Sequence, residues 1–162
     1  MRHRSEPFFF CAALLLINAL IIVWCCLDYT LPVYDMAMHL LSGLHCRDLL
    51  LHPHLRSNNW WQGLLAVNPL YPPFVYLVYG LLKLIFGPQR WVDILVHCLF
   101  CTVLFSSVYG IGRLIFKNAA SALLAAVIIF TYPSVFLFAH CDMLDMPGLA
   151  MVALSLFCFT WW

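Results

Sequence analysis

The chain has few charged side chains: Asp, Glu, Lys and Arg together make up 9% of its 162 residues, against roughly a quarter in ordinary soluble domains. Its basic residues stand singly and the formal net charge is +1, so no basic patch for nucleic acid forms and no nucleic-acid partner is expected. Hydrophobic residues account for 65% of the sequence. A core of this length cannot bury that much apolar surface, so the composition predicts an integral membrane protein.

The sequence also lacks a cysteine framework. Most of the eight cysteines lie inside apolar runs, and the C-x-x-C pair of Cys98 and Cys101 falls in the middle of one. In such places Cys acts as a small hydrophobic residue, so neither a disulfide scaffold nor a zinc finger is predicted. No convincing repeat relates the two halves of the chain, whereas many transporters carry one.

Long apolar runs predict an all-α fold, a polytopic bundle of transmembrane helices. The first run, residues 8–27, would be about 30 Å long as a helix, which matches the hydrocarbon core of a bilayer. It is long and lacks a small-x-small cleavage site, so we expect a retained helix rather than a signal peptide. Further runs cover residues 70–86, 92–115, 119–139 and 148–162.

Residues 28–68 form the only long stretch that is not simply a span. Leucines and a methionine recur there near helical spacing, while His39 lies on another face. This pattern predicts an amphipathic helix on the membrane surface, within the first extramembrane loop. Pro53 ends it, and Trp60 and Trp61 are expected to anchor the chain at the interface. The apolar positions are Met36, Leu40, Leu44 and Leu51, with Leu41 and Leu50 alongside.

The last apolar run stops at residue 162 without a flanking charge. We therefore expect residues 1–162 to form a single transmembrane domain that is the N-terminal part of a longer module. Such a piece would be catalytically incompetent alone, because it has too few helices to enclose a lipid donor.

The orientation of the chain depends on Arg2 and Arg4, which precede the first run. The positive-inside rule then places the N-terminus in the cytoplasm and the first loop in the lumen or periplasm. If every run crosses the membrane, the two sides carry equal numbers of basic residues, and the loops give no orientation. Pro133 is expected to break the run of residues 119–139. A run that fails to cross there would bring Asp145 to the side of Asp35.

Short polar motifs stand at the ends of these apolar runs. Asp35 follows the first run, Tyr71-Pro72-Pro73 opens the second, and Asp145-Met146-Pro147 opens the last. This ordered layout resembles the N-terminal part of the GT-C superfamily of polyprenyl-phosphate-sugar glycosyltransferases. It is most similar to the branch of protein O-mannosyltransferases and lipid A aminoarabinose transferases.

The resemblance implies roles for particular residues. Asp35 matches the first-loop aspartate that acts as catalytic base or metal ligand, and Tyr71 starts the helix that borders the active site. Asp145, or less favoured Asp142, matches the second acidic site, which would bind substrate or a divalent metal ion shared with Asp35. Met36 stands where O-mannosyltransferases have a glutamate, which favours a lipid or glycan acceptor over a protein.

The chemistry of such a transfer agrees with these positions. A carboxylate takes the proton of the acceptor hydroxyl, and one carboxylate suffices for displacement with inversion. Arg47 and Arg56, with His52 and His54, are candidate partners for the departing phosphate or a metal.

The sequence therefore predicts a membrane glycosyltransferase that uses a polyprenyl-phosphate sugar and a lipid, glycan or protein acceptor, in contact with membrane lipids. The alternative is a non-catalytic multi-pass protein, transporter-like or an assembly subunit. In that case Tyr71-Pro72-Pro73 is only a helix start, and Asp145 only complements a helix dipole.

Overall fold

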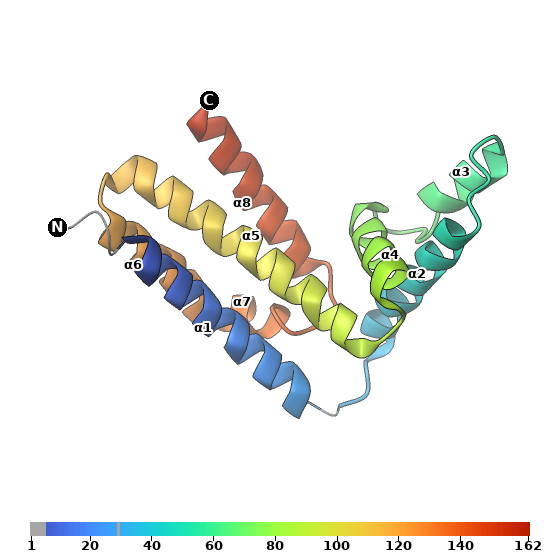
Figure 1. Cartoon of the computed structure of the whole chain (residues 1–162), viewed down its shortest axis with the longest axis horizontal. Coiled ribbons are helices and arrows are strands. Elements are labelled where there is room, and N and C mark those ends of the chain that lie inside the picture. Colours follow the sequence, from blue (N-terminus) through green and yellow to red (C-terminus); the bar gives the residue numbers. More distant parts are fainter. Residues whose placement is uncertain (1–5, 29) are drawn as a thin grey trace. The chain divides into compact units, whose positions relative to one another are not determined.

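The computed structural model describes residues 6–28 and 30–162, and within them the chain is helical with no strand. This confirms the all-α prediction for the described part. The helices (Figure 1) are α1 (Glu6–Leu27), α2 (Tyr34–Leu51), α3 (Asn58–Leu65), α4 (Phe74–Phe86), α5 (Arg90–Phe116), α6 (Ala119–Thr131), α7 (Pro133–Phe138) and α8 (Asp145–Trp161).

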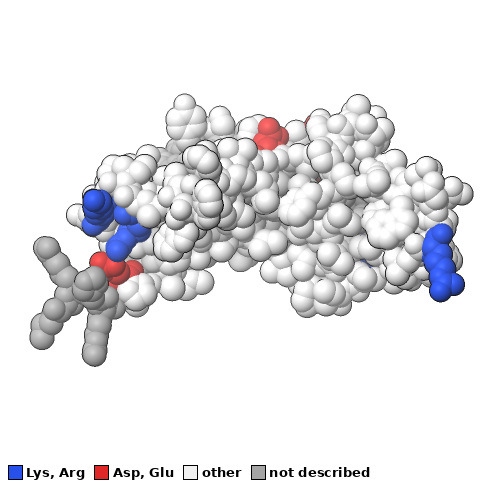
Figure 2. All heavy atoms as spheres, turned by 90° about the horizontal axis from the view of Figure 1, so that it is seen from above, with Lys and Arg blue, Asp and Glu red and all other residues white. Residues whose placement is uncertain are grey.

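Two of these helices, α1 and α5, are long and apolar enough to cross a membrane. The apolar helices α4, α6 and α8 are shorter, with 13, 13 and 17 residues. Charged side chains are sparse over the face seen in Figure 2, as expected of a surface that contacts lipid. The multi-pass arrangement stays a prediction, and Arg2 and Arg4, which set its orientation, lie outside the described residues.

The chain divides into two compact units. Unit 1 comprises residues 1–29, 97–141 and 145–162, and unit 2 comprises residues 30–96 and 142–144. Helix α5 begins in unit 2 and continues into unit 1 at residue 97. The single domain expected over residues 1–162 stays a prediction.

In unit 1, α1 and α5 run antiparallel. Arg113 near the end of α5 donates to Glu6 at the start of α1, with 2.8 Å between Nη1 and Oε2. Halfway along, Asn18 Nδ2 donates to Thr102 Oγ1 at 3.3 Å. The start of α1 and the end of α5 therefore lie at one end of unit 1.

Pro133 divides the run of residues 119–139, as predicted. Helix α6 ends at Thr131 and α7 begins at Pro133, because proline lacks the N–H that would continue the helix. After α7, the His140 carbonyl accepts from Cys25 Sγ at 3.9 Å, and its ring lies 4.9 Å from that of Trp24. Cys25 and Trp24 are in the last turn of α1.

Helices α6 and α7 together thus lead from the Glu6 end of unit 1 to its Trp24 end, alongside α1 (Figure 1). Whether this run crosses a membrane stays a prediction. The break at Tyr132 bends the path without reversing it, because the backbone there is extended for one residue before α7 begins.

In unit 2, α2 packs closely on α4. A Cβ at Gly80 would lie 2.9 Å from Cys46 Sγ and 3.1 Å from the Arg47 nitrogen, and one at Gly43 would lie 3.0 Å from Tyr79 Cβ. Small residues let two helix backbones approach in this way. The buried face of α2 consists of His39, Ser42, Gly43 and Cys46.

The predicted helix of residues 28–68 exists, but the leucines do not form its buried face in unit 2. Leu41 is 60% exposed and Leu51 is also exposed. The small polar face packs inward because only small side chains permit the contact with Gly80. Leu41 and Leu51 face outward, where a membrane surface would cover them, whereas Leu50 packs against buried side chains of unit 2.

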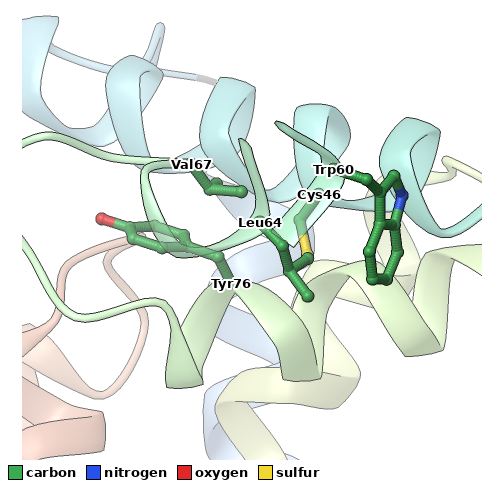
Figure 3. Close-up of a cluster of buried hydrophobic side chains, with 5 residues drawn as sticks. All are labelled: Cys46, Trp60, Leu64, Val67 and Tyr76. Atoms are coloured by element: carbon green, nitrogen blue, oxygen red, sulfur yellow. The ribbon is translucent and has the colours of Figure 1, made fainter. Parts of the chain in front are cut away.

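Helix α3 packs on α2 and α4 through a cluster of buried hydrophobic side chains (Figure 3). The cluster consists of Cys46, Trp60, Leu64, Val67 and Tyr76. The Trp60 indole N–H donates to the Leu49 carbonyl at 2.9 Å. Trp60 is therefore a core residue, and its prediction as an interfacial anchor is wrong. Its neighbour Trp61 is exposed, as an anchor would be.

A turn at residues 87–90 joins α4 to α5. Gly87 has φ 89°, which favours glycine, and its N–H donates to the Lys83 carbonyl. Close to this turn, Lys83 Nζ lies 2.7 Å from Asp93 Oδ1, and both side chains are buried. The charges of Lys83 and Asp93 thus compensate each other inside unit 2.

Candidate functional site

Asp35 lies in the first turn of α2, with its side chain about half exposed (48%). The preceding residues are extended or irregular up to Val33, the N-cap residue. The N-terminal end of a helix carries a partial positive charge, which stabilises a carboxylate in the first turn. Asp35 therefore offers an exposed carboxylate at a fixed place on a rigid element.

One turn further along α2, His39 stands beside Asp35. Its Nε2 lies 3.7 Å from Asp35 Oδ1, and the imidazole is almost fully buried. The i, i+4 spacing puts the two side chains on the same face of the helix. A buried ring cannot turn freely, so its Nε2 keeps a fixed position near the carboxylate.

The other ring nitrogen of His39 contacts a side chain of α4. His39 Nδ1 lies 2.7 Å from the Tyr76 hydroxyl, which points away from the rest of the hydrophobic cluster (Figure 3). Burial first, then the nearby Tyr71 and Asp35, raise the pKa of Tyr76 to about 12. The phenol therefore stays protonated at neutral pH, and when it donates to Nδ1, the proton on the ring is at Nε2 and faces Asp35.

Tyr71 completes this group from the loop before α4. Its ring meets that of His39 edge to face, with 5.2 Å between the centroids. The buried Asn68 connects this loop to α2, because its Nδ2 donates to Ser42 Oγ at 3.2 Å. Its Oδ1 accepts from the Leu70 N–H at 2.9 Å within the loop. Sequence reasoning selected Asp35 and Tyr71 separately, and the structure brings both to His39.

Arg47 and Arg56 lie elsewhere in unit 2. Arg47 is twelve residues beyond Asp35 on the same helix, which corresponds to about 18 Å along its axis. Its Nη1 lies 3.2 Å from Asp48 Oδ1, while its buried Nε has no hydrogen-bond partner in the described part of the chain. Arg56 is exposed, beyond the end of α2. The structure does not bring either guanidinium to Asp35.

The two later acids fall in different units. Asp145 is exposed in the first turn of α8, in unit 1, as its place at a helix start predicted. Asp142 belongs to unit 2, like Asp35, and its Oδ1 accepts from the Tyr79 hydroxyl at 3.5 Å. The shared site of Asp35 and Asp145 stays a prediction. Of the two later acids, Asp142 is the one that belongs to the same unit as Asp35.

A metal centre is not formed by the residues that the structure describes, since no group of three or more His, Cys, Asp or Glu side chains comes together there. Asp35 and His39 alone offer two ligand atoms, fewer than the three protein ligands of typical catalytic zinc sites. A divalent ion shared by Asp35 and Asp145 stays a prediction, and His52 and His54 are exposed beyond α2.

Sequence reasoning missed His39 and Tyr76 as members of this site. The spacing of His39 from Asp35 was a usable signal, because residues four apart on a helix are neighbours. Tyr76 gave no such signal, since its role depends on α4 packing against α2. Comparison with family models, with curated proteins and with solved structures finds no match.

Proposed function

We propose that the protein is a membrane glycosyltransferase that moves a sugar from a polyprenyl phosphate to an acceptor hydroxyl, with Asp35 as the base. The observation that carries the proposal is the sequence of contacts from the exposed Asp35 carboxylate through buried His39 to the Tyr76 hydroxyl. A structural acid at a helix start needs no such support behind it. A catalytic carboxylate does, because its position must be held to well under 1 Å.

In this mechanism the acceptor oxygen attacks the anomeric carbon of the donor while its proton passes to Asp35. The bond between that carbon and the phosphate oxygen breaks, and its electron pair leaves with the phosphate. One displacement inverts the anomeric configuration. His39 Nε2–H steadies the carboxylate, Tyr76 fixes the tautomer of His39, and Tyr71 borders the acceptor. The acceptor is a hydroxyl of a lipid, glycan or protein.

A multi-pass topology supports this function. We infer that α1, α5, the α6–α7 pair and α8 each cross the membrane once, and in support of this α5 and the α6–α7 pair run between the same two ends of unit 1 as α1 does. In this topology residues 30–96 make no net crossing. The thirteen residues of α4 would reach only about 20 Å in any case.

Asp35 and Asp145 then both follow the Trp24 end of unit 1 along the chain, on the non-cytoplasmic side if the N-terminus is cytoplasmic. That is the side predicted for the first loop. Arg47, Arg56 and Asp145 would contact parts of the donor or acceptor away from the reacting carbon. Any bound divalent ion would assist the departing phosphate.

The experiment compares sugar transfer in membranes from cells that express the complete product of the gene. Asp35→Asn keeps the shape of the side chain and removes the base, so transfer should fall about 100-fold or more. Asp48→Asn is the matched control, since Asp48 is an exposed carboxylate on the same helix. Transfer by Asp35→Asn within about threefold of the unmodified protein, at equal expression, would refute the proposal.

A further inference from the structure

Unit 1 contains a cavity of about 850 Å³ at the end where α1 begins, α5 ends and α6 begins. Its lining has two parts. Glu6, Arg113 and Lys117 line a polar end, and Phe9, Leu124 and Val127 are among the residues of an apolar wall. A site with this division suits a molecule that is itself polar at one end and apolar at the other.

The polar end carries one uncompensated positive charge. Arg113 and Glu6 form an ion pair with 2.8 Å between their charged atoms. Lys117 is exposed and forms no ion pair with the described part of the chain. The side chain of Asn118 is already occupied, since its Oδ1 accepts from the Ala120 N–H at 2.9 Å. The group that complements this end is therefore an anion.

The apolar wall is open to the surroundings of the helices. Phe9 is 55% and Leu124 60% exposed. Phe9 belongs to α1, which is long and apolar enough to cross a membrane, and Leu124 belongs to α6. A free phosphate ion or a soluble anion would leave this wall unfilled, whereas a hydrocarbon chain would cover it.

We propose that this cavity binds one anionic phospholipid. Its phosphate-bearing headgroup lies against Lys117 and Arg113, and one acyl chain lies along Phe9, Leu124 and Val127. The ends of α1 and α5 that form the polar end would stand at the cytoplasmic surface, where anionic lipids are concentrated. The site is independent of sugar transfer and lies at the other end of unit 1 from the Trp24 end.

The proposal is tested by native mass spectrometry of the purified chain, released from detergent after titration with phosphatidylglycerol or phosphatidylcholine of the same acyl chains. One cation near a lipid headgroup is worth about fivefold in affinity. The first phosphatidylglycerol molecule should therefore bind about fivefold or more tightly than phosphatidylcholine. Lys117→Gln should remove most of this preference, and Arg90→Gln, which removes an exposed cation from unit 2, should keep it.

A second variant tests the apolar wall. Val127→Trp places a large ring in the apolar part of the cavity and should weaken binding of the first phosphatidylglycerol severalfold, while glycerol phosphate should not compete at equal concentration. Equal binding of the two lipids by the unmodified chain would overturn the proposal. So would a preference that survives Lys117→Gln, displacement by glycerol phosphate, or a cavity occupied by a second copy of the chain, seen as dimers that bind no lipid.

Discussion

Replacing Tyr76 with phenylalanine tests the contact that holds His39. The change removes only the hydroxyl that lies 2.7 Å from Nδ1 of the buried imidazole. A buried acceptor left without its donor costs about 1–3 kcal/mol, so the free energy of unfolding should fall by that amount. Denaturant titration in detergent micelles measures it, and Tyr132→Phe, at a tyrosine that is 67% exposed, should change it little.

The loss of unfolding free energy in Tyr76→Phe should also depend on pH. The pKa of Tyr76 is raised to about 12 in the fold from the ordinary value of 10.0, chiefly by burial. The protonated phenol therefore stabilises the fold fully below pH 10, and this stabilisation is lost as the pH rises toward 12. The difference between the unmodified protein and Tyr76→Phe should shrink over that window. A constant difference from pH 8 to 12, or an equal loss in Tyr132→Phe, would refute the assignment of the hydrogen bond.

Further changes test the packing and the topology. Gly80→Ala places a Cβ 2.9 Å from Cys46 Sγ and should lower the free energy of unfolding by about 1–3 kcal/mol. Gly63→Ala, whose Cβ would meet only the end of Leu49 at 3.7 Å, should be neutral or stabilising, and equal losses would contradict the close contact of α2 and α4. Asn58→Cys, in a background without native cysteines, should react with an impermeant maleimide from the non-cytoplasmic side. Ala120→Cys should be protected there, and labelling of both from one side would contradict the proposed crossings.

Local features of the fold could be predicted from the sequence because short-range chemistry decides them. The length of α1, the turn at Gly87, the break at Pro133 and the start of α8 at Asp145 each follow from a few adjacent residues. A proline removes a backbone donor and a glycine permits positive φ whatever surrounds them.

Features that depend on packing between helices were missed. The apolar pattern of residues 28–68 indicated a surface helix but not which face packs on α4, and the contact with Gly80 places the small face of α2 inward. The same contact brings Tyr76 to His39, which no spacing along the chain reveals. The path of α6 and α7 could not be predicted, because a proline break fixes where a helix ends and not the direction in which the chain continues.

The central claim is that Asp35 and His39 act together as the base of a sugar transfer, and a double-mutant cycle tests it most directly. Initial rates of transfer from a polyprenyl-phosphate sugar are measured for the complete gene product and for Asp35→Asn, His39→Asn and the double variant. Loss of the base should cost about 100-fold or more, and loss of its support about 10–100-fold. If the two residues form one unit, the double variant should be no slower than Asp35→Asn alone. A double variant whose rate loss equals the product of the two single losses would contradict the claim. So would full activity in His39→Asn.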